Sequence, residues 1–529
     1  MNAQPVSTTL YRSGDAVYNE YTGGVVGYQA SGSIKSCTNR GSMISSSNQQ
    51  YLYMGGIAGD FAEGEAENNV NVAKLDLQGD ATSAVKGVRY ASVGGLYGRF
   101  GAVQSDSDKN SSNSGPITVL NVETAADNST TLNLGGVAGY IDSESPLSSL
   151  TNTGAITADL VANFTAFAIG GISGSTECGI SDSKNSGTLM INNGILLKNT
   201  SSRICFGGIA GRNVAGDLNT YSGCVNDGEV GISTKSNDFN ILPAFTGGIL
   251  GYTEMPVAVK GCENNGYVNS SGANNKYDGL FSAAGGIVGA IVETVAEVAD
   301  CIVSVDIRNY AYNRNIDMDP FKMCHCGGIV GCAVGESQSN IVKISNCSNS
   351  GALENKRSTA AGIVGFAKYA AVSDCRFTGS VVGSGPHFAA GIAGCLSDAS
   401  VTDCIVKSPD IYSHSSLGFN SINHFPAAGI VGYLYGKSSV SRCKAFATLI
   451  QNVGSTANEQ MHVGMGLIAG ISTAGSTISD CGVGGTLNTG SAGKVQNVIM
   501  TVTSDNFGNC IVGDGNVTPS GCYYWNGQE

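Results

Sequence analysis

The sequence predicts an all-β protein, a right-handed parallel β-helix (β-solenoid) of about thirteen coils. Three observations favour this fold class: one glycine-rich phrase recurs along the chain, 75 of the 529 residues are Gly, and the apolar runs between turns are short and β-branched. Glycine is about twice as frequent as the roughly 7% that is usual, and only 13% of the residues are charged against a usual ~25%. With only ten Pro and no Gly at every third position, the chain is not collagen.

The recurring phrase has the form GGxxG and occurs thirteen times. Its copies begin at Gly23, Gly55, Gly94, Gly135, Gly170, Gly207, Gly247, Gly285, Gly327, Ala361, Ala390, Ala428 and Met465. The second residue of the phrase moves from Gly24 to Gly466 over twelve intervals, so the mean period is about 37 residues. Variable spacing indicates a fixed segment with loops of free length, as in solenoids. We expect residues 1–22 to be a lead-in, the tail of a preceding coil, and residues 23–529 to be the solenoid.

The third position of the phrase is aliphatic in every copy, from Val25 to Leu467, whereas the fourth position is mixed. An apolar position beside a variable one is typical of a strand with one buried face, so the phrase itself predicts a strand with a corner at each end. Each coil would then hold two or three short strands.

A second marker, a cysteine, follows 12 to 19 residues after the phrase. It occurs as Cys37, Cys224, Cys262, Cys301, Cys347, Cys375, Cys404, Cys443, Cys481 and Cys522. Val or Ile lies three residues before eight of these, which predicts a bend between the two. An N-x-G turn follows, at Asn39, Asn113, Asn152, Asn185, Asn226, Asn264 and Asn349. We expect these asparagines to tolerate positive φ and to bond the backbone of neighbouring coils.

Two other repeat architectures fit less well. An α-solenoid needs apolar residues at i, i+3, i+4 and i+7 over ten or more residues, which these short runs lack. A propeller of thirteen blades exceeds the usual four to eight.

The order of GGIVG, V-x-D-C and N-x-G resembles the GLUG-motif repeats of bacterial surface and secreted proteins, from about Gly23 to the end of the chain, where CYYWN resembles the close of a unit. The resemblance implies a β-solenoid at the cell surface or secreted from a bacterium, and it implies no chemistry. Units with Ser183 or Leu150 in place of the Cys depart from the pattern, so the Cys is not essential to the coil.

Composition excludes some partners. The net charge of −13 argues against nucleic acid, which needs clustered positive charge. The longest apolar stretch, 279–292, ends at Glu293 and falls short of the ~18 residues of a membrane span. The first twenty residues show no signal-peptide pattern, and we expect the chain to have been cut from a longer one.

The ten marker cysteines predict a column of buried thiols, because side chains stacked one coil apart run parallel and do not converge as a disulfide requires. We expect most of the seventeen thiols to be free and unreactive in the native chain. Cys324, His325, Cys326 and Cys332 form the one group with a metal-like composition. Their C-x-C spacing departs from the C-x2-4-C of zinc sites, so core packing is expected. No metal or cofactor site is predicted.

Acidic residues directly before the marker cysteine form an interrupted row, Asp300, Asp374, Asp403 and Asp480. Asp374 and Asp403 are the pair on adjacent coils. Such a row is used by β-helix polysaccharide lyases and hydrolases for calcium or acid/base chemistry, which gives an alternative catalytic interpretation beside a solvated acidic face.

The favoured function is a non-enzymatic scaffold or adhesin that presents variable loops to a surface protein or glycan. Loops expected at 309–323 and 407–425 carry Tyr310, Tyr312, Tyr412, His414, Phe419 and His424. The residue after the phrase is aromatic at Tyr28, Tyr140, Tyr252, Phe366 and Tyr433. Because these lie mostly three coils apart, scattered edge packing is expected, not a continuous platform for sugars. An ice-binding solenoid would need regular T-x-T repeats, which are missing.

Overall fold

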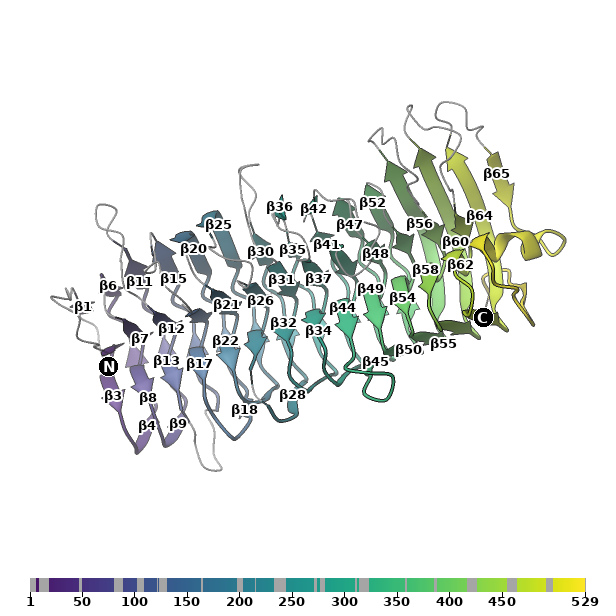
Figure 1. Cartoon of the computed structure of the whole chain (residues 1–529). Coiled ribbons are helices and arrows are strands. Elements are labelled where there is room, and N and C mark those ends of the chain that lie inside the picture. Colours follow the sequence, from purple (N-terminus) through teal and green to yellow (C-terminus); the bar gives the residue numbers. More distant parts are fainter. Residues whose placement is uncertain are drawn as a thin grey trace. The chain divides into compact units, whose positions relative to one another are not determined.

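The computed structural model describes residues 6–8, 19–46, 50–79, 89–101, 109–120, 122, 131–162, 165–196, 203–214, 216–232, 244–270, 274–275, 281–309, 312–313, 323–356, 359–384, 388–415, 426–453, 464–490 and 498–528. They hold β-strands and one 3-10 helix, η2 (Phe507–Cys510), and no α-helix occurs among them. Strands of successive coils pair in parallel, which confirms the predicted parallel β-solenoid class (Figure 1). The chain forms two compact units: Met1–Ala258 with Cys262–Leu280, and Val259–Gly261 with Phe281–Glu529.

One coil of the first unit shows the repeating order of five strands. A pre-corner strand, β7 (Tyr51–Gly55), leads through a tight corner into a post-corner strand, β8 (Ala58–Phe61). A third strand, β9 (Glu65–Glu67), precedes a two-residue ladder strand, β10 (Val70–Asn71), and a closing strand, β11 (Leu75–Gln78). The predicted two or three strands per coil are therefore five shorter segments.

The first unit repeats this order in seven coils. Its pre-corner strands are β2 (Asn19–Gly23), β7, β12 (Tyr90–Gly94), β16 (Thr131–Gly135), β21 (Ala166–Gly170), β26 (Arg203–Gly207) and β31 (Ala244–Gly247). Its post-corner strands are β3 (Val26–Gln29), β8, β13 (Tyr97–Phe100), β17 (Ala138–Ile141), β22 (Ser173–Thr176), β27 (Ala210–Asn213) and β32 (Leu250–Thr253). Its third strands are β4 (Ser33–Lys35), β9, β18 (Leu147–Ser148), β23 (Ile180–Ser181) and β28 (Asn219–Ser222), and β33 (Val257–Lys260) contains the boundary between the units.

The remaining strands of the first unit complete each coil. The ladder strands are β5 (Thr38–Asn39), β10, β14 (Ser112–Asn113), β19 (Thr151–Asn152), β24 (Lys184–Asn185), β29 (Val225–Asn226) and β34 (Glu263–Asn264). The closing strands are β6 (Met43–Ser45), β11, β15 (Ile117–Leu120), β20 (Ile156–Ala162), β25 (Leu189–Leu196), β30 (Val230–Ile232) and β35 (Val268–Ser270), and β1 (Val6–Thr8) pairs with β6. The short strand β36 is Asn274–Asn275.

The second unit has six pre-corner strands and seven post-corner strands. The pre-corner strands are β37 (Ala283–Gly285), β43 (His325–Gly327), β48 (Thr359–Ala361), β53 (Ala389–Ala390), β57 (Ala427–Ala428) and β61 (Met465–Gly466). The post-corner strands are β38 (Val288–Ile291), β44 (Val330–Val334), β49 (Val364–Lys368), β54 (Ala393–Ser397), β58 (Val431–Tyr435), β62 (Ala469–Ser472) and β66 (Val512–Gly515). The third strands are β39 (Ala296–Ala299), β45 (Val342–Ser345), β50 (Ala370–Ser373), β55 (Ser400–Thr402), β59 (Ser439–Ser441) and β63 (Thr477–Ser479).

Ladder and closing strands of the second unit are separate at first and then merge. The separate pairs are β40 (Ile302–Val303) with β41 (Ile307–Asn309), β46 (Ser348–Asn349) with β47 (Leu353–Lys356), and β51 (Arg376–Phe377) with β52 (Val381–Ser384). The merged strands are β56 (Ile405–Ser415), β60 (Lys444–Val453) and β64 (Gly482–Gly490), followed by β65 (Val498–Thr501), antiparallel to β64, and β67 (Tyr523–Tyr524). The short strand β42 is Tyr312–Asn313.

The GGxxG phrase is the corner itself. In the second coil, β7 ends at Gly55, Gly56 and Ile57 form the bend, and β8 begins at Ala58. Both Ile57 and Ala58 are fully buried, so the predicted alternation of one buried and one variable face is wrong: a chain that turns inside the phrase points both side chains inward. Val25, in the terminal coil, is 48% exposed, unlike the other members of the aliphatic column.

Close packing inside the coil explains the second glycine of the phrase. A Cβ on Gly208 would lie 1.9 Å from the carbonyl oxygen of Gly248 and 2.3 Å from Cγ of Asn226. The corner therefore rests on the ladder strand across the coil, with room for hydrogen alone.

The residue before the marker cysteine has a positive φ in every coil. Non-glycine examples include Asp182 (φ 46°), Asn346 (φ 51°) and Asp480 (φ 56°), and Gly223 and Gly261 share the position. Asp, Asn and Gly are the residues that adopt this left-handed conformation at least cost. The bend predicted before the cysteine is therefore confirmed. The ladder asparagines are strand residues without positive φ. The positive φ predicted for them occurs instead at the residue three positions earlier in the chain.

Seven buried asparagines form a continuous column in the first unit. They are Asn39, Asn71, Asn113, Asn152, Asn185, Asn226 and Asn264. Nδ2 of each of the first six donates to Oδ1 of the next at 2.8–2.9 Å. From Asn71 onward, Nδ2 also donates to the carbonyl two residues further on at 2.9–3.0 Å. The column thus bonds side chains of neighbouring coils and the backbone of its own turn. Asn71 escaped the N-x-G pattern because Ala73 replaces the glycine.

Seven cysteines form the corresponding column of the second unit, one position before the ladder strand. They are Cys301, Cys347, Cys375, Cys404, Cys443, Cys481 and Cys522, and all but Cys522 are buried. Each thiol donates to the carbonyl two residues earlier at 3.2–3.5 Å. All seventeen cysteines of the chain are free, which confirms the predicted absence of disulfides.

Candidate functional site

Outward side chains of the pre-corner and post-corner strands face each other across the corner. In the first unit the rings of Tyr21 and Tyr28 lie 5.1 Å apart, and those of Phe245 and Tyr252 lie 4.7 Å apart. The hydroxyl of Ser175 donates to Oδ1 of Asn133 at 2.8 Å. The outer surface is therefore concave at this corner, and we call the space between the two sets of strands the corner groove.

Tyrosines line the corner groove over the first four coils of the first unit. Tyr21, Tyr53 and Tyr90 follow one another on β2, β7 and β12, with ring centroids 5.4 and 5.5 Å apart. Tyr140 on β17 continues the line, 6.3 Å from Tyr90 and nearly perpendicular to it. We call these four the tyrosine row. Burial raises the pKa of Tyr53 and of Tyr90, so both phenols are neutral donors near pH 7.

The five aromatics that follow the phrase pack in separate places, as predicted, whereas the tyrosine row was not predicted. Every aromatic residue after the phrase packs on a ring from a pre-corner strand or from the residue directly before one, in the pairs Tyr28–Tyr21, Tyr140–Tyr90, Tyr252–Phe245, Phe366–His325 and Tyr433–Phe388. The prediction considered one sequence position alone. The partners stand two or four residues before a phrase, in the same coil for Tyr28 and Tyr252 and in the preceding coil for the other three. They meet because the chain turns at the corner and the coils stack.

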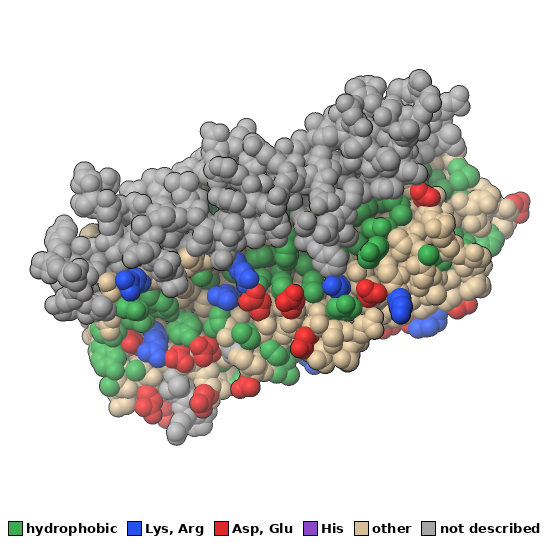
Figure 2. Space-filling model, viewed as in Figure 1, with side chains coloured by type: hydrophobic (Ala, Val, Ile, Leu, Met, Phe, Trp, Pro, Cys, Tyr) green, Lys and Arg blue, Asp and Glu red, His purple; other side chains and the backbone are tan. Residues whose placement is uncertain are grey.

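One arginine bridges two carboxylates beside the tyrosine row. Arg99 on β13 donates through Nη2 to Asp142 at 2.5 Å and lies 3.6 Å from Asp60 through Nη1. Burial alone would lower the pKa of Arg99, but the hydrogen bond to Asp142 and the charge of Asp60 raise it. Burial raises the pKa of Asp60 despite the neighbouring guanidinium. Acidic and basic side chains are likewise interspersed on the described face in Figure 2.

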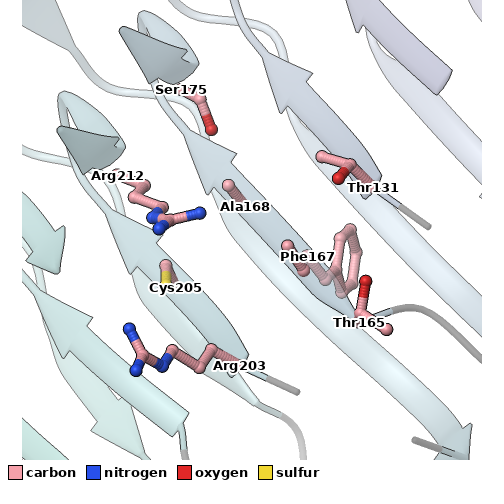
Figure 3. Close-up of a pocket in the computed structure, with 9 residues that line it drawn as sticks. Thr131, Thr165, Phe167, Ala168, Ser175, Arg203, Cys205 and Arg212 are labelled. Carbon is pink, nitrogen blue, oxygen red and sulfur yellow. The ribbon is translucent and has the colours of Figure 1, made fainter. Parts of the chain in front are cut away.

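A cavity of about 190 Å³ opens beyond the tyrosine row, where the fifth coil carries small side chains. Ala166 and Ala168 of β21 line it. Thr131 and Ser175 supply hydroxyl groups (Figure 3). We call this cavity the notch. It is smaller than the roughly 300–1,000 Å³ of pockets for drug-sized ligands, so it suits a group the size of one sugar ring.

Two arginines line the notch. Their guanidinium groups lie on either side of Cys205, and that of Arg212 extends toward Ala168 (Figure 3). Arg203 donates to the Tyr252 hydroxyl and to Glu254, and it stacks over the Tyr252 ring at 4.8 Å. Tyr252 also donates to Glu254. Arg203 is thus held firmly in place by its partners.

Glu254 compensates one of these two positive charges. Burial alone would raise its pKa, but the hydrogen bonds from Tyr252 and Arg203 hold the pKa of Glu254 below its ordinary value, so it is ionised at neutral pH. Arg212 reaches Glu254 only at 4.0 Å through Nη2. Nε of Arg212 is buried and has no hydrogen-bond partner. Two guanidiniums therefore face one carboxylate in the notch.

The corner groove of the second unit is filled by apolar and aromatic side chains. His325 stacks on Phe366 at 5.0 Å, and its Nδ1 lies 2.7 Å from Oγ1 of Thr359. Cys332 is fully buried nearby in sequence. The Cys324, His325, Cys326 and Cys332 group is therefore core, as predicted, and no metal-binding group of three or more ligands occurs in the described part of the chain. Burial raises the pKa of Cys326 and of Cys332.

The acidic row lies at the left-handed bends before the cysteine column. Asp374 (φ 54°) and Asp403 (φ 56°) occupy equivalent positions of adjacent coils. Asp403 accepts two hydrogen bonds from Arg442, at 2.8 and 2.6 Å, and this contact lowers the pKa of Asp403. Asp300 accepts a bond from Asn346 at 2.6 Å. The left-handed backbone conformation therefore explains why Asp occurs at these positions without a catalytic or metal-binding role.

The loops predicted to carry recognition fall partly outside the described residues. Residues 310–311, 314–322 and 416–425 are not described, and these ranges include Tyr310, Phe419 and His424. The loop expected from residue 407 is wrong as far as residue 415: that stretch, with Tyr412 and His414, belongs to β56, which pairs with β52 and β60. Without an N-x-G turn, the ladder strand continues directly into the closing strand.

The fold and the corner groove define a parallel β-solenoid protein with a lined outer groove in its first unit. No family model, no curated protein and no solved structure matches the chain. Among the described residues, no helix is long and apolar enough to span a membrane.

Proposed function

We propose that this chain is a non-enzymatic repeat scaffold, displayed on a bacterial cell surface or secreted, that binds a surface protein or glycan. The observation that carries the proposal is the difference between the two corner grooves. In the second unit, side chains such as Phe366 and Phe388 fill the groove and are buried. In the first unit, half-buried tyrosines and two arginines line it. Such amphipathic side chains are enriched at recognition surfaces.

The family resemblance supports the location, because GLUG-motif repeats belong to surface and secreted proteins. The enzymatic alternative, a polysaccharide lyase or hydrolase, relied on Asp374 and Asp403. A general acid needs a raised pKa, whereas Arg442 lowers that of Asp403. The left-handed backbone at these positions accounts for the choice of Asp. Binding is therefore the better-supported function.

The test measures binding and turnover on the same chain. Binding of the full chain to immobilised surface glycans and surface proteins is compared between the parent and the variant Tyr53→Ala/Tyr90→Ala. Tyr523→Ala/Tyr524→Ala is the control, because these two tyrosines are exposed outside the groove. We expect the groove variant to lose at least about tenfold in affinity and the control to retain it.

Turnover is assayed against acidic and neutral glycans with and without calcium. We expect no release of reducing ends by the parent. Release that disappears in Asp374→Asn/Asp403→Asn would replace the scaffold by the enzymatic alternative. Equal binding by the groove variant and the parent would remove the corner groove from the proposal.

A further inference from the structure

We propose that the notch of the first unit binds the carboxylate of one acidic sugar of a glycan, whose neighbouring sugar lies over the tyrosine row. The inference rests on the proposed binding function and names its ligand class. Its starting point is an incomplete ion pair. Arg203 is satisfied by Tyr252 and Glu254, whereas Arg212 has one contact at 4.0 Å and a buried Nε without a partner.

A carboxylate is the group that completes this arrangement. A guanidinium presents its donors as a planar fork that matches the two oxygens of a carboxylate. Two arginines against Glu254 leave one positive charge uncompensated, so the notch complements a single negative charge. Nη2 of Arg212 lies 4.0 Å from Glu254 and so makes no short ion pair there, and a carboxylate in the notch would supply one.

The rest of the notch fits a sugar ring. The hydroxyl of Thr131 can donate to or accept from ring hydroxyls, and that of Ser175, which already donates to Oδ1 of Asn133, can accept from one. Ala166 and Ala168 keep the notch open, because any longer side chain on β21 would occupy the cavity. The volume of about 190 Å³ limits the bound group to about one ring.

The tyrosine row extends the site along the chain of sugars. Tyr90 on β12 pairs with Thr131 on β16, which in turn pairs with Ala166 on β21, so the tyrosine row ends beside the notch. A pyranose presents one face of C–H groups, which packs on an aromatic ring. A peptide would leave these flat rings without a matching partner unless it carried aromatics of its own. The combination therefore favours a glycan over an acidic peptide.

The net charge of the chain further limits the class of glycan that can bind. A net charge of −13 repels a densely charged polyanion at long range. Glu177, which accepts a hydrogen bond from Tyr140, adds negative charge beside the tyrosine row. The expected ligand thus carries one isolated acidic sugar, either a uronic acid or a sialic acid, among neutral ones.

The experiment compares matched acidic and neutral sugars by calorimetry on the full chain. The two pairs of probes are methyl β-glucuronide against methyl β-glucoside, and sialyllactose against lactose. We expect one acidic member to bind at least about tenfold more tightly than its neutral counterpart. The pair that shows the preference identifies the source of the carboxylate.

Three variants locate the site. Arg212→Gln should abolish the acidic preference and leave weak binding of the neutral sugar, Ala168→Leu should abolish binding of both, and Arg442→Gln, an exposed arginine of the second unit, should change neither. Thermal melting of each variant within a few degrees of the parent shows that the fold is retained. Equal affinity for acidic and neutral probes, or an unchanged preference in Arg212→Gln, would overturn the inference.

Two further outcomes separate this inference from the proposed function. If the tripeptide Gly-Glu-Gly competes as strongly as the glucuronide, the notch recognises acidic side chains and the glycan class is wrong. If Arg212→Gln leaves binding to surface proteins intact and no glycan binds, the inference fails while the scaffold function stands. Cleavage of the bound glycan would contradict the non-enzymatic function and leave the acidic-sugar site in place.

Discussion

The two units stack their coils through different columns of identical residues. In the first unit the ladder position is Asn in all seven coils, while the cysteine position varies through Asn69, Ser111, Leu150 and Ser183. In the second unit the cysteine position is constant, and the ladder position varies, with Val303, Asn349, Phe377, Val406 and Ala445 among its occupants. Each unit therefore keeps one column unbroken and relaxes the other.

The chemistry of the two columns explains this exchange. An asparagine in the column needs its neighbours, because its amide groups have no water to bond and take partners from the next coils. A thiol such as that of Cys404 bonds backbone carbonyls alone, at 3.3 Å in its own bend and at 4.0 Å in the preceding coil, and otherwise packs as a small hydrophobe. One foreign residue breaks the first column, whereas the second column tolerates changes around it. The asparagine column thus specifies the register of the coils, and the cysteine column mainly fills space.

The largest effect should come from the aliphatic corner column, on which both units depend. Ile329→Asp places a carboxylate in a fully buried site of the second unit, and we expect a loss of about 5 kcal/mol or more. Circular-dichroism melting with limited proteolysis should show the second unit unfolded. Val25→Asp is the control at the same position of the phrase, where the side chain is 48% exposed, and it should cost less than about 1 kcal/mol. Comparable losses in the two variants would contradict the corner assignment.

Breaking the asparagine column should cost almost as much. Asn185→Leu removes the acceptor of Asn152, the donor to Asn226 and both bonds to Gly187. At about 1–3 kcal/mol for each buried group left without a partner, we expect a loss of about 4 kcal/mol in chemical denaturation of the first unit.

The matched control is Asn349→Leu in the second unit. Asn349 bonds only the backbone of Gly362 and Gly351, and its column neighbours are Val303 and Phe377. We expect about half the loss. An equal loss at the two positions would show that the column acts through local turns and not through its continuity.

Features that repeat in every coil could be predicted from the sequence, and features confined to one coil could not. Regular columns such as the aliphatic corner and the cysteines are visible because every coil repeats them. The corner inside GGxxG was missed because burial of both Ile57 and Ala58 reflects a turn and not a strand period. Arg203 and Arg212 stand nine residues apart on two strands, and only the corner brings them together. The notch depends on small residues that occur at these positions of one coil, so a pattern shared by all coils does not reveal it.

Changes in the cysteine column should have smaller effects. Cys404→Ala leaves a small cavity in the second unit and removes a weak bond to Thr402, and we expect a loss of about 1–2 kcal/mol by chemical denaturation. Cys404→Ser should be close to neutral, because Ser183 occupies the same position of the first unit and donates to Ser181 at 2.8 Å. A serine variant less stable than the alanine variant would show that the column requires sulfur and not a donor to its own bend.

The smallest expected effect is a loss of stability at alkaline pH, which should differ between the units because they contain different numbers of thiols. Twelve of the seventeen cysteines lie in the second unit and five in the first. Burial raises the pKa of Cys178 and of Cys205 to about 11, and it raises the pKa of Cys326, Cys332 and Cys395 as well.

Because the folded pKa exceeds the unfolded value of about 8.5, the stability from neutral buried thiols is complete below that pH. It is lost as the pH rises through the folded pKa, so denaturation midpoints should fall between about pH 8.5 and 11. The fall should be steeper for the second unit and smaller in Cys326→Val/Cys332→Val, because this variant separates the effect of the thiols from that of the tyrosines that titrate in the same range.

A thiol reagent at pH 8 should reach only Cys37 and Cys522 in the native chain and all seventeen cysteines after denaturation, because those two alone are partly exposed. Ten or more reactive thiols in the native chain would contradict the buried column.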